Sequence, residues 1–194
     1  MIHVVSTITV VLLWLLYLPM FFGRGKPNSQ QNTKNSASSF GIALQFSGVA
    51  VIWIWRRQLF SPLPAMPFPA SVVAPVVAVL IAAGSVWFSW VALRTLGKYW
   101  SFVAGVSSEH RLVREGPYAI VRHPLYSCFF GLNLAIGIVW SEPVALPFGI
   151  VLFWVGVWIR VYSEERILRE AFGEEFDRYV KSVPSFFPTL GREK

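Results

Sequence analysis

The sequence contains little charge and almost no cysteine. Charged residues make up 14% of its 194 residues, against roughly 25% in an ordinary soluble domain. The single cysteine, Cys128, cannot form an intramolecular disulfide, which excludes a disulfide-stapled secreted domain. The chain has three histidines but no Cys-x-x-Cys or His-Glu-x-x-His motif, so no catalytic metal is expected. It also lacks a Gly-x-Gly-x-x-Gly motif after a strand, which excludes a Rossmann-type cofactor domain.

Apolar residues are abundant instead. They make up 55% of the chain, including nine Trp and sixteen Phe, and the mean hydropathy is +0.54. The net charge of +7 lies in short blocks between apolar runs. This arrangement is typical of a polytopic membrane protein, and we expect no nucleic-acid partner.

Five apolar runs are candidates for membrane spans. A hydrocarbon core of roughly 30 Å needs about 20 apolar residues in a helix. The fourth and fifth runs have about sixteen residues each and reach only about 24 Å, so they tilt little, have snorkelling residues at their ends, or form a hairpin that crosses incompletely. The first run has no Lys or Arg before it, which argues against a signal peptide. The predicted spans are 2–22, 40–55, 72–96, 125–140 and 144–159.

We therefore predict an all-α polytopic membrane helix bundle with five transmembrane helices and a C-terminal amphipathic cytosolic helix. That last helix is expected over 164–181, where apolar residues recur at helical spacing opposite a charged face. The chain is expected to be one membrane domain over 1–194. The N-terminal spans lie in 1–93, and the cofactor-binding and catalytic half is 94–194. Asn133, in the middle of a span, predicts an interhelical hydrogen bond.

The basic residues predict the orientation in the membrane. Fifteen Lys and Arg residues fall on one side of the five spans and two on the other. Because basic residues concentrate in cytoplasmic loops, the N-terminus is expected outside and the C-terminus in the cytosol. This orientation also brings the long third loop, 97–124, and the C-terminal tail to the same cytosolic side.

Polar groups of possible function gather in these two segments. Pro124 excludes His123 from a helix interior and begins the fourth span, so the imidazole is presented at the end of that helix. Arg160, Glu164 and Glu165 follow the fifth span, where ionisable groups are unusual unless they face a functional cavity. At a spacing of four, Arg160 and Glu164 share one helix face, whereas Glu165 lies about 140° from Arg160. A single structural histidine is the alternative interpretation of His123.

The combined motif resembles the isoprenylcysteine carboxyl methyltransferase family. It runs from Gly-Pro-Tyr at 116–118 through Arg-His-Pro-x-Tyr at 122–126 and Arg-x(3)-Glu-Glu at 160–165, and ends with Phe-Gly-Glu-Glu-Phe at 172–176 and Val-Pro and Phe-Pro at 183–188. The resemblance covers about residues 94–190. It implies an integral membrane enzyme that uses S-adenosylmethionine to methylate the carboxylate of a prenylated C-terminal cysteine, and that releases S-adenosylhomocysteine.

The resemblance also implies roles for particular residues. Arg160 and Glu165 are the expected catalytic residues, and Arg160 with Trp158 would contact the substrate, a prenylated cysteine or other lipid from the bilayer. Arg160 can hold either the acceptor carboxylate or the cofactor carboxylate. The expected cofactor-binding residues are His110, Leu112, Val113, Tyr118, His123, Pro124, Tyr126, Glu164 and Glu165.

Carboxyl methylation fits this set of residues because a carboxylate with a pKa near 4 is already ionised at neutral pH and needs no general base. Three alternatives stay open. Arg-His-Pro-x-Tyr alone also resembles phospholipid methyltransferases, whose acceptor is a lipid amine. It resembles membrane sterol reductases as well, which would imply a nicotinamide cofactor. The third alternative is a non-catalytic membrane scaffold.

Overall fold

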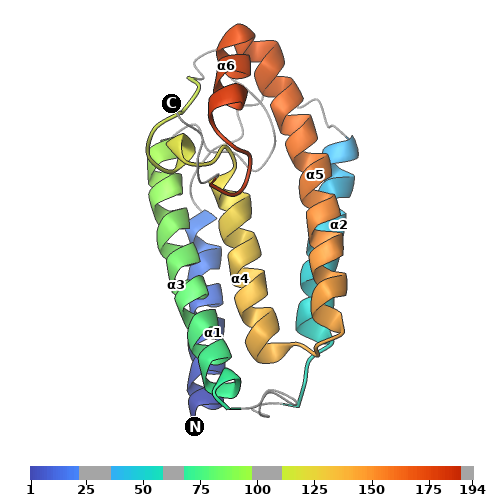
Figure 1. Cartoon of the computed structure of the whole chain (residues 1–194). Coiled ribbons are helices and arrows are strands. Elements are labelled where there is room, and N and C mark those ends of the chain that lie inside the picture. The colour runs from blue at the N-terminus through green and yellow to red at the C-terminus, as the bar shows by residue number, and fades with distance from the viewer. Residues whose placement is uncertain (22–35, 59–67, 98–110, 189–194) are drawn as a thin grey trace.

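The computed structural model describes residues 1–21, 36–58, 68–97 and 111–188, and Figure 1 shows these residues as an elongated helical bundle. The all-helical prediction is confirmed over these ranges. The α-helices are α1 (Ile2–Tyr17), α2 (Ser36–Ile54), α3 (Ala70–Leu96), α4 (Pro124–Trp140), α5 (Ala145–Phe172) and α6 (Glu174–Ser182). Two short 3-10 helices, η1 (Leu18–Phe21) and η3 (Gly116–Ala119), accompany them.

Three of the described helical segments are long and apolar enough to cross a membrane. They are Ile2–Met20, Ala70–Leu96 and Ala145–Phe172. Two further apolar helices, Ser38–Ile54 and Pro124–Trp140, are shorter. The observed helices lie close to all five predicted spans, so the protein is a helical membrane protein with three full-length candidate spans.

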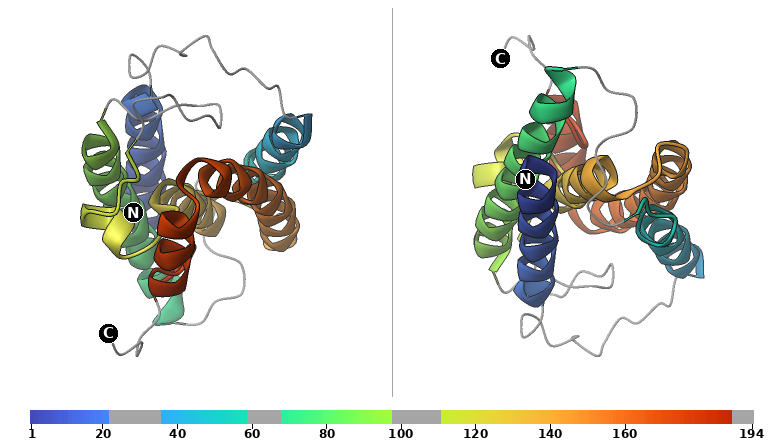
Figure 2. Two further views of the ribbon diagram at one scale, coloured as in Figure 1. Left: turned by 90° about the horizontal axis from the view of Figure 1, so that it is seen from above. Right: turned by 90° about the horizontal axis from the view of Figure 1, so that it is seen from below.

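The long helices alternate in direction, and α4 lies in the middle of the bundle (Figures 1 and 2). α1 packs against α3, α2 packs against α5, and α4 contacts all four of these helices. The N-terminal end of α4 and the C-terminal end of α5 therefore lie at the same end of the molecule, where α6 is also found. We call this the α6 end.

Pairs of glycines bring the backbones of α2 and α5 into direct contact. A Cβ atom on Gly156 would lie 2.5 Å from the carbonyl oxygen of Gly41 and 2.5 Å from the amide nitrogen of Gln45. A Cβ on Gly48 would lie 2.5 Å from the carbonyl oxygen of Gly149. Small residues allow such close packing between membrane helices. The position of α2 along α5 is thus set by backbone contact.

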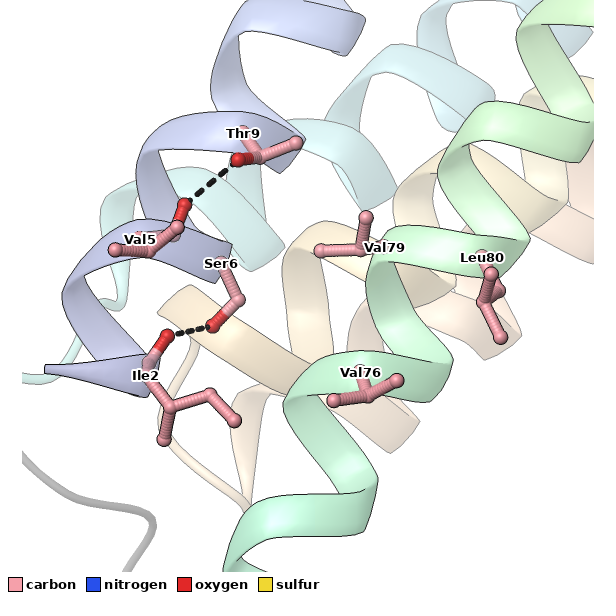
Figure 3. Close-up of a pocket in the computed structure, with 7 residues that line it drawn as sticks. All are labelled: Ile2, Val5, Ser6, Thr9, Val76, Val79 and Leu80. Atoms are coloured by element: carbon pink, nitrogen blue, oxygen red, sulfur yellow. Dashed lines mark hydrogen bonds between the residues drawn. The ribbon is translucent and has the colours of Figure 1, made fainter.

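A groove between α1 and α3 lies at the opposite end of the bundle, and Figure 3 shows it in close-up. Its only hydroxyl groups, those of Ser6 and Thr9, donate to carbonyl oxygens one turn earlier, at Ile2 and Val5. The other side chains around it are those of Ile2, Val5, Val76, Val79 and Leu80. The groove is therefore apolar and offers no reactive group.

The prediction of one amphipathic helix over 164–181 is wrong in its bounds. α5 continues without a break through this region to Phe172, and α6 begins only after Gly173. Gly173 ends α5 with a φ of 51°, in the left-handed region that glycine adopts at little cost. Arg160, Glu164 and Glu165 are consequently carried on the same rigid helix as the fifth predicted span.

The expected interhelical hydrogen bond of Asn133 is also wrong. Its Nδ2 atom donates to the carbonyl oxygen of Phe129, one turn earlier in α4, at 2.7 Å. The side-chain amide thus forms this hydrogen bond within its own helix and does not join two helices. Cys128, in the same helix, is buried and forms no disulfide.

Candidate functional site

His123 stands at the N-cap of α4, where Pro124 is the first helical residue. Its φ of −123° and ψ of 60° are not helical, because the proline ring excludes the α conformation from the residue before it. The His123 side chain is 8% exposed, and its Nε2 atom lies 2.9 Å from Oε1 of Glu165 on α5. The expected placement of His123 at the end of the fourth span is confirmed.

Glu165 accepts hydrogen bonds from two residues at the same oxygen. The Nε and Nη2 atoms of Arg122 donate to its Oε1 at 3.0 and 2.8 Å. The Nε2 atom of His123 completes the group. Since Arg122 and Glu165 keep only 9% and 17% of their side-chain surface exposed, this is a largely buried ion pair. Such a pair persists only where hydrogen bonds compensate for lost hydration.

Arg160 and Glu164 form a second pair on the neighbouring face of α5. The Nη2 atom of Arg160 lies 3.7 Å from Oε1 of Glu164, as their spacing of four residues predicts. Its Nη1 atom donates to Oε1 of Gln45 on α2 at 3.2 Å. The guanidinium carbon also lies 5.2 Å from the ring centre of Tyr126, a distance at which a cation is attracted to an aromatic face.

Tyr126 and His123 connect the two pairs. The Tyr126 hydroxyl donates to Oε1 of Glu164, and Nδ1 of His123 lies 3.9 Å from Oε2 of the same residue. The result is one continuous polar cluster between the first turn of α4 and the C-terminal half of α5. We call it the α4–α5 cluster and define it as Arg122, His123, Tyr126, Arg160, Glu164 and Glu165.

The segment after α6 covers one side of this cluster. The backbone amides of Arg122 and His123 donate to the carbonyl oxygens of Pro184 and Ser185 at 2.8 and 2.9 Å. The Arg122 guanidinium also donates to the carbonyl oxygen of Val183 and to Oγ of Ser185. The ring of Phe186 lies 5.8 Å from that of His123, centre to centre. The described end of the third loop and the tail therefore lie together at the α6 end, as their predicted location on one side of the bundle requires.

Three other sequence-predicted site residues pack against helices at the α6 end. Leu112 packs with α6 residues, whereas Val113 and Tyr118 pack against the end of α3. Burial raises the pKa of the Tyr118 phenol well above its usual value, so this group stays neutral. Trp158 is 66% exposed, and His110 falls outside the described residues.

Sequence reasoning missed three members of this arrangement. Arg122 belongs to the recognised motif, but its side chain was not predicted to join the site. Gln45 is the only amide side chain in the apolar helix α2 and is 1% exposed, a signal that could have marked it. Ser185 could not be found, because its contact depends on the return of the tail to α4. Among the described residues, no group of three His, Cys, Asp or Glu side chains could hold a metal ion.

Comparison with known proteins shows which family the segment with the α4–α5 cluster resembles. Residues 76–170 match the family model of the isoprenylcysteine carboxyl methyltransferase (ICMT) family. This segment is therefore similar to the ICMT family. It contains every residue of the α4–α5 cluster, whereas α2 with Gln45, α6 and the tail lie outside it.

Individual relatives match over stretches of similar length. Protein-S-isoprenylcysteine O-methyltransferase B of Arabidopsis thaliana is 33% identical over 100 residues, which are 50% of each chain. The Schizosaccharomyces pombe protein-S-isoprenylcysteine O-methyltransferase is 38% identical over 85 residues, 43% of this chain and 36% of its own. The nickel-cobalt-cadmium resistance protein NccN of Alcaligenes xylosoxydans xylosoxydans is 35% identical over 103 residues, 52% of this chain and 47% of its own. The chain spans about half the length of these relatives, or less.

Proposed function

We propose that this protein is an S-adenosylmethionine-dependent methyltransferase that esterifies the carboxylate of a prenylated cysteine or a related lipid-borne acid at the cytosolic membrane interface. The α4–α5 cluster carries the proposal. Two guanidinium groups and two carboxylates lie together, largely buried, at one end of an apolar bundle and inside the ICMT segment. A purely structural bundle has no need for four ionisable groups at this depth.

The residues of the cluster fit the proposed cofactor chemically. S-adenosylmethionine carries an ammonium group, a carboxylate, ribose hydroxyls and a sulfonium sulfur, and when bound it supplies the methyl group on that sulfur. Glu164 and Glu165 offer acceptors for its cationic groups and hydroxyls. His123 and Tyr126 hold these carboxylates in place. The other proposed cofactor-binding residues are His110, Leu112, Val113, Tyr118 and Pro124.

Arg160 is the proposed binding group for the acceptor. A guanidinium can bind a carboxylate through two parallel hydrogen bonds, which fix the orientation of the carboxylate as well as its position. Because the acceptor is already ionised, the protein has to bring it in line with the methyl group and exclude water. Proximity and orientation of this kind supply roughly 7–11 kcal/mol of a barrier.

We propose that the two ligands enter from different sides. The cofactor is water-soluble and would reach the α6 end from the cytosol. The prenyl chain of the acceptor would remain in the bilayer, where each buried CH₂ contributes about 0.8 kcal/mol, and enter sideways near α4 and α5. In this arrangement all five apolar helices of the single domain cross the membrane. The N-terminus lies outside, and Trp158, exposed on α5, meets the lipid or the prenyl chain.

A lipid amine is the second candidate acceptor. The observation that favours it is the Arg-His-Pro-x-Tyr motif at 122–126, which also resembles phospholipid methyltransferases. The match to NccN, whose name refers to metal resistance, has an identity like that of the methyltransferases. The ICMT segment thus accompanies more than one named role. A nicotinamide-dependent reductase and a non-catalytic scaffold remain the alternatives from other classes.

Binding of S-adenosylhomocysteine to the detergent-purified protein tests the proposed function. We expect isothermal titration calorimetry to detect one saturable site for S-adenosylhomocysteine. We expect no binding heat with reduced nicotinamide adenine dinucleotide phosphate. Binding of the nicotinamide cofactor alone would favour the reductase. The absence of heat with either compound, in protein that unfolds cooperatively, would favour the scaffold.

A further inference from the structure

Gln45 is a buried amide that reaches the α4–α5 cluster from outside the ICMT segment. It lies on α2, is 1% exposed, and accepts a hydrogen bond from Nη1 of Arg160 at 3.2 Å. A buried amide is unfavourable in an apolar bundle unless it is hydrogen-bonded. Neither the family match nor the sequence motif assigns a role to this residue.

The backbone around Gln45 holds its amide at a fixed distance from α5. The Cα hydrogens of Gly156 face the backbone nitrogen of Gln45, since a Cβ there would lie only 2.5 Å from it. Arg160 lies one turn after Gly156 on α5, and a Cβ on Gly41 of α2 would lie 2.9 Å from its Cγ atom. At the other end of α2, Oγ of Ser141 donates to the carbonyl oxygen of Ile52 at 2.8 Å. The helix carrying Gln45 is therefore anchored along its length.

Gln45 is uncharged, and this affects the charge balance around Arg160. An amide oxygen accepts a hydrogen bond from a guanidinium without neutralising its charge. The carboxylate near Arg160, that of Glu164, lies 3.7 Å away, and its Oε1 accepts the hydroxyl of Tyr126. Gln45 thus orients Arg160 through a hydrogen bond without placing a second carboxylate beside the guanidinium, which already lies near Glu164.

We propose that Gln45 is a positioning residue that orients Arg160 toward the acceptor carboxylate, so that α2 sets the affinity of the site for acidic acceptors. The proposal rests on the proposed function. Gln45 would act through Arg160 and not on the reacting atoms. The proposal therefore predicts an effect on acceptor binding that is separate from cofactor binding and from folding.

The test uses full-length protein with S-farnesylated cysteine as acceptor and S-adenosylmethionine as donor. We expect Gln45→Leu to raise the acceptor KM about tenfold, the effect of losing one hydrogen bond to a charged group. The Kd for S-adenosylhomocysteine should change less than about twofold, because the substitution does not contact the proposed cofactor site. Gln45→Glu should also raise the acceptor KM, because its carboxylate pairs with Arg160 in place of the acceptor.

Ser47→Ala is the matched control, since Ser47 is exposed on the same helix and its Oγ donates to the carbonyl oxygen of Ala43, one turn earlier in α2. Gln45→Glu preserves side-chain size and one acceptor oxygen, so it tests the proposal even if Gln45→Leu does not fold. An unchanged acceptor KM in the folded variants would overturn the role of Gln45. A weaker affinity for S-adenosylhomocysteine with an unchanged KM would overturn it too, and would assign Arg160 to the cofactor. A parent that methylates no acid at all would instead overturn the proposed function, and this proposal with it.

Discussion

Arg122 and Glu165 are joined by two hydrogen bonds that end on a single carboxylate oxygen, at 2.8 and 3.0 Å. The same guanidinium donates to the carbonyl oxygen of Val180 in α6, at 3.3 Å, and to that of Val183 just after α6. One side chain thus ties together α4, α5, α6 and the segment after α6. Because Glu165 also contacts His123, the position of Arg122 determines how both of these groups are held.

Arg122→Lys should disturb this junction while it preserves the charge. A single ammonium group cannot reproduce the planar set of guanidinium donors. We expect a loss of about 2 kcal/mol in the free energy of unfolding, because some of the hydrogen bonds between the guanidinium and its partners would be lost. Thermal unfolding in detergent measures it. The control is Arg166→Lys, because Arg166 is 61% exposed and pairs with Glu170. Equal melting temperatures for the two variants would contradict the role of Arg122.

Glu165→Gln should weaken the binding of S-adenosylhomocysteine. The substitution removes a charged acceptor that is held by two donors, a contribution of about 1.5–3 kcal/mol, or roughly ten- to hundredfold in Kd. His123→Ala should weaken binding less, since Arg122 would still hold the carboxylate. Calorimetry of each variant measures both effects, with Glu170→Gln as an exposed control. If both site variants bound like the parent, the proposed cofactor pocket would be wrong.

Gly156→Ala should push α2 away from α5. The added methyl group would lie 2.5 Å from backbone atoms of Gly41 and Gln45, which cannot rotate out of the way. We expect a loss of about 1–3 kcal/mol in the free energy of unfolding from overpacking. Gly84→Ala is the matched control, since its Cβ meets no atom within 4 Å. A Gly156→Ala variant as stable as Gly84→Ala would show that the close approach of α2 and α5 is not required.

The proposed membrane orientation predicts the location of two reporter fusions. A reporter fused after Lys194 should behave as cytosolic, and one inserted at Met66 as external, because of the asymmetry of fifteen basic residues against two. Alkaline phosphatase and green fluorescent protein fusions distinguish the two sides. An external C-terminal reporter would place the α4–α5 cluster on the side away from the cytosolic cofactor.

The apolar runs predicted the helices closely, because each span is a continuous stretch with an evident end. The third and fourth predicted spans begin within two residues of α3 and α4 and end with them. The tail was harder, since the apolar period continues across Gly173 and hides the break between α5 and α6. Periodicity shows which residues share a face, but it does not show where a glycine changes the direction of the chain.

The candidate site was predictable only where local spacing decides the geometry. Arg160 and Glu164 meet because they are four residues apart, and His123 is placed by Pro124. The contacts of Arg122 and Gln45 depend on segments that are distant in sequence. Gln45 meets Arg160 only because glycines on both helices set the register of α2 against α5. No local pattern contains that information.

Methyl transfer to a defined acceptor tests the central claim most directly. Purified protein would be given radiolabelled S-adenosylmethionine with either S-farnesylated cysteine or phosphatidylethanolamine in mixed micelles. The products would be separated by base lability, since a carboxyl methyl ester releases methanol in base and a methylated amine does not. The account predicts a base-labile ester of the farnesylated cysteine, and far less of it with Arg160→Ala. A base-stable methylated lipid amine, with no ester, would contradict it.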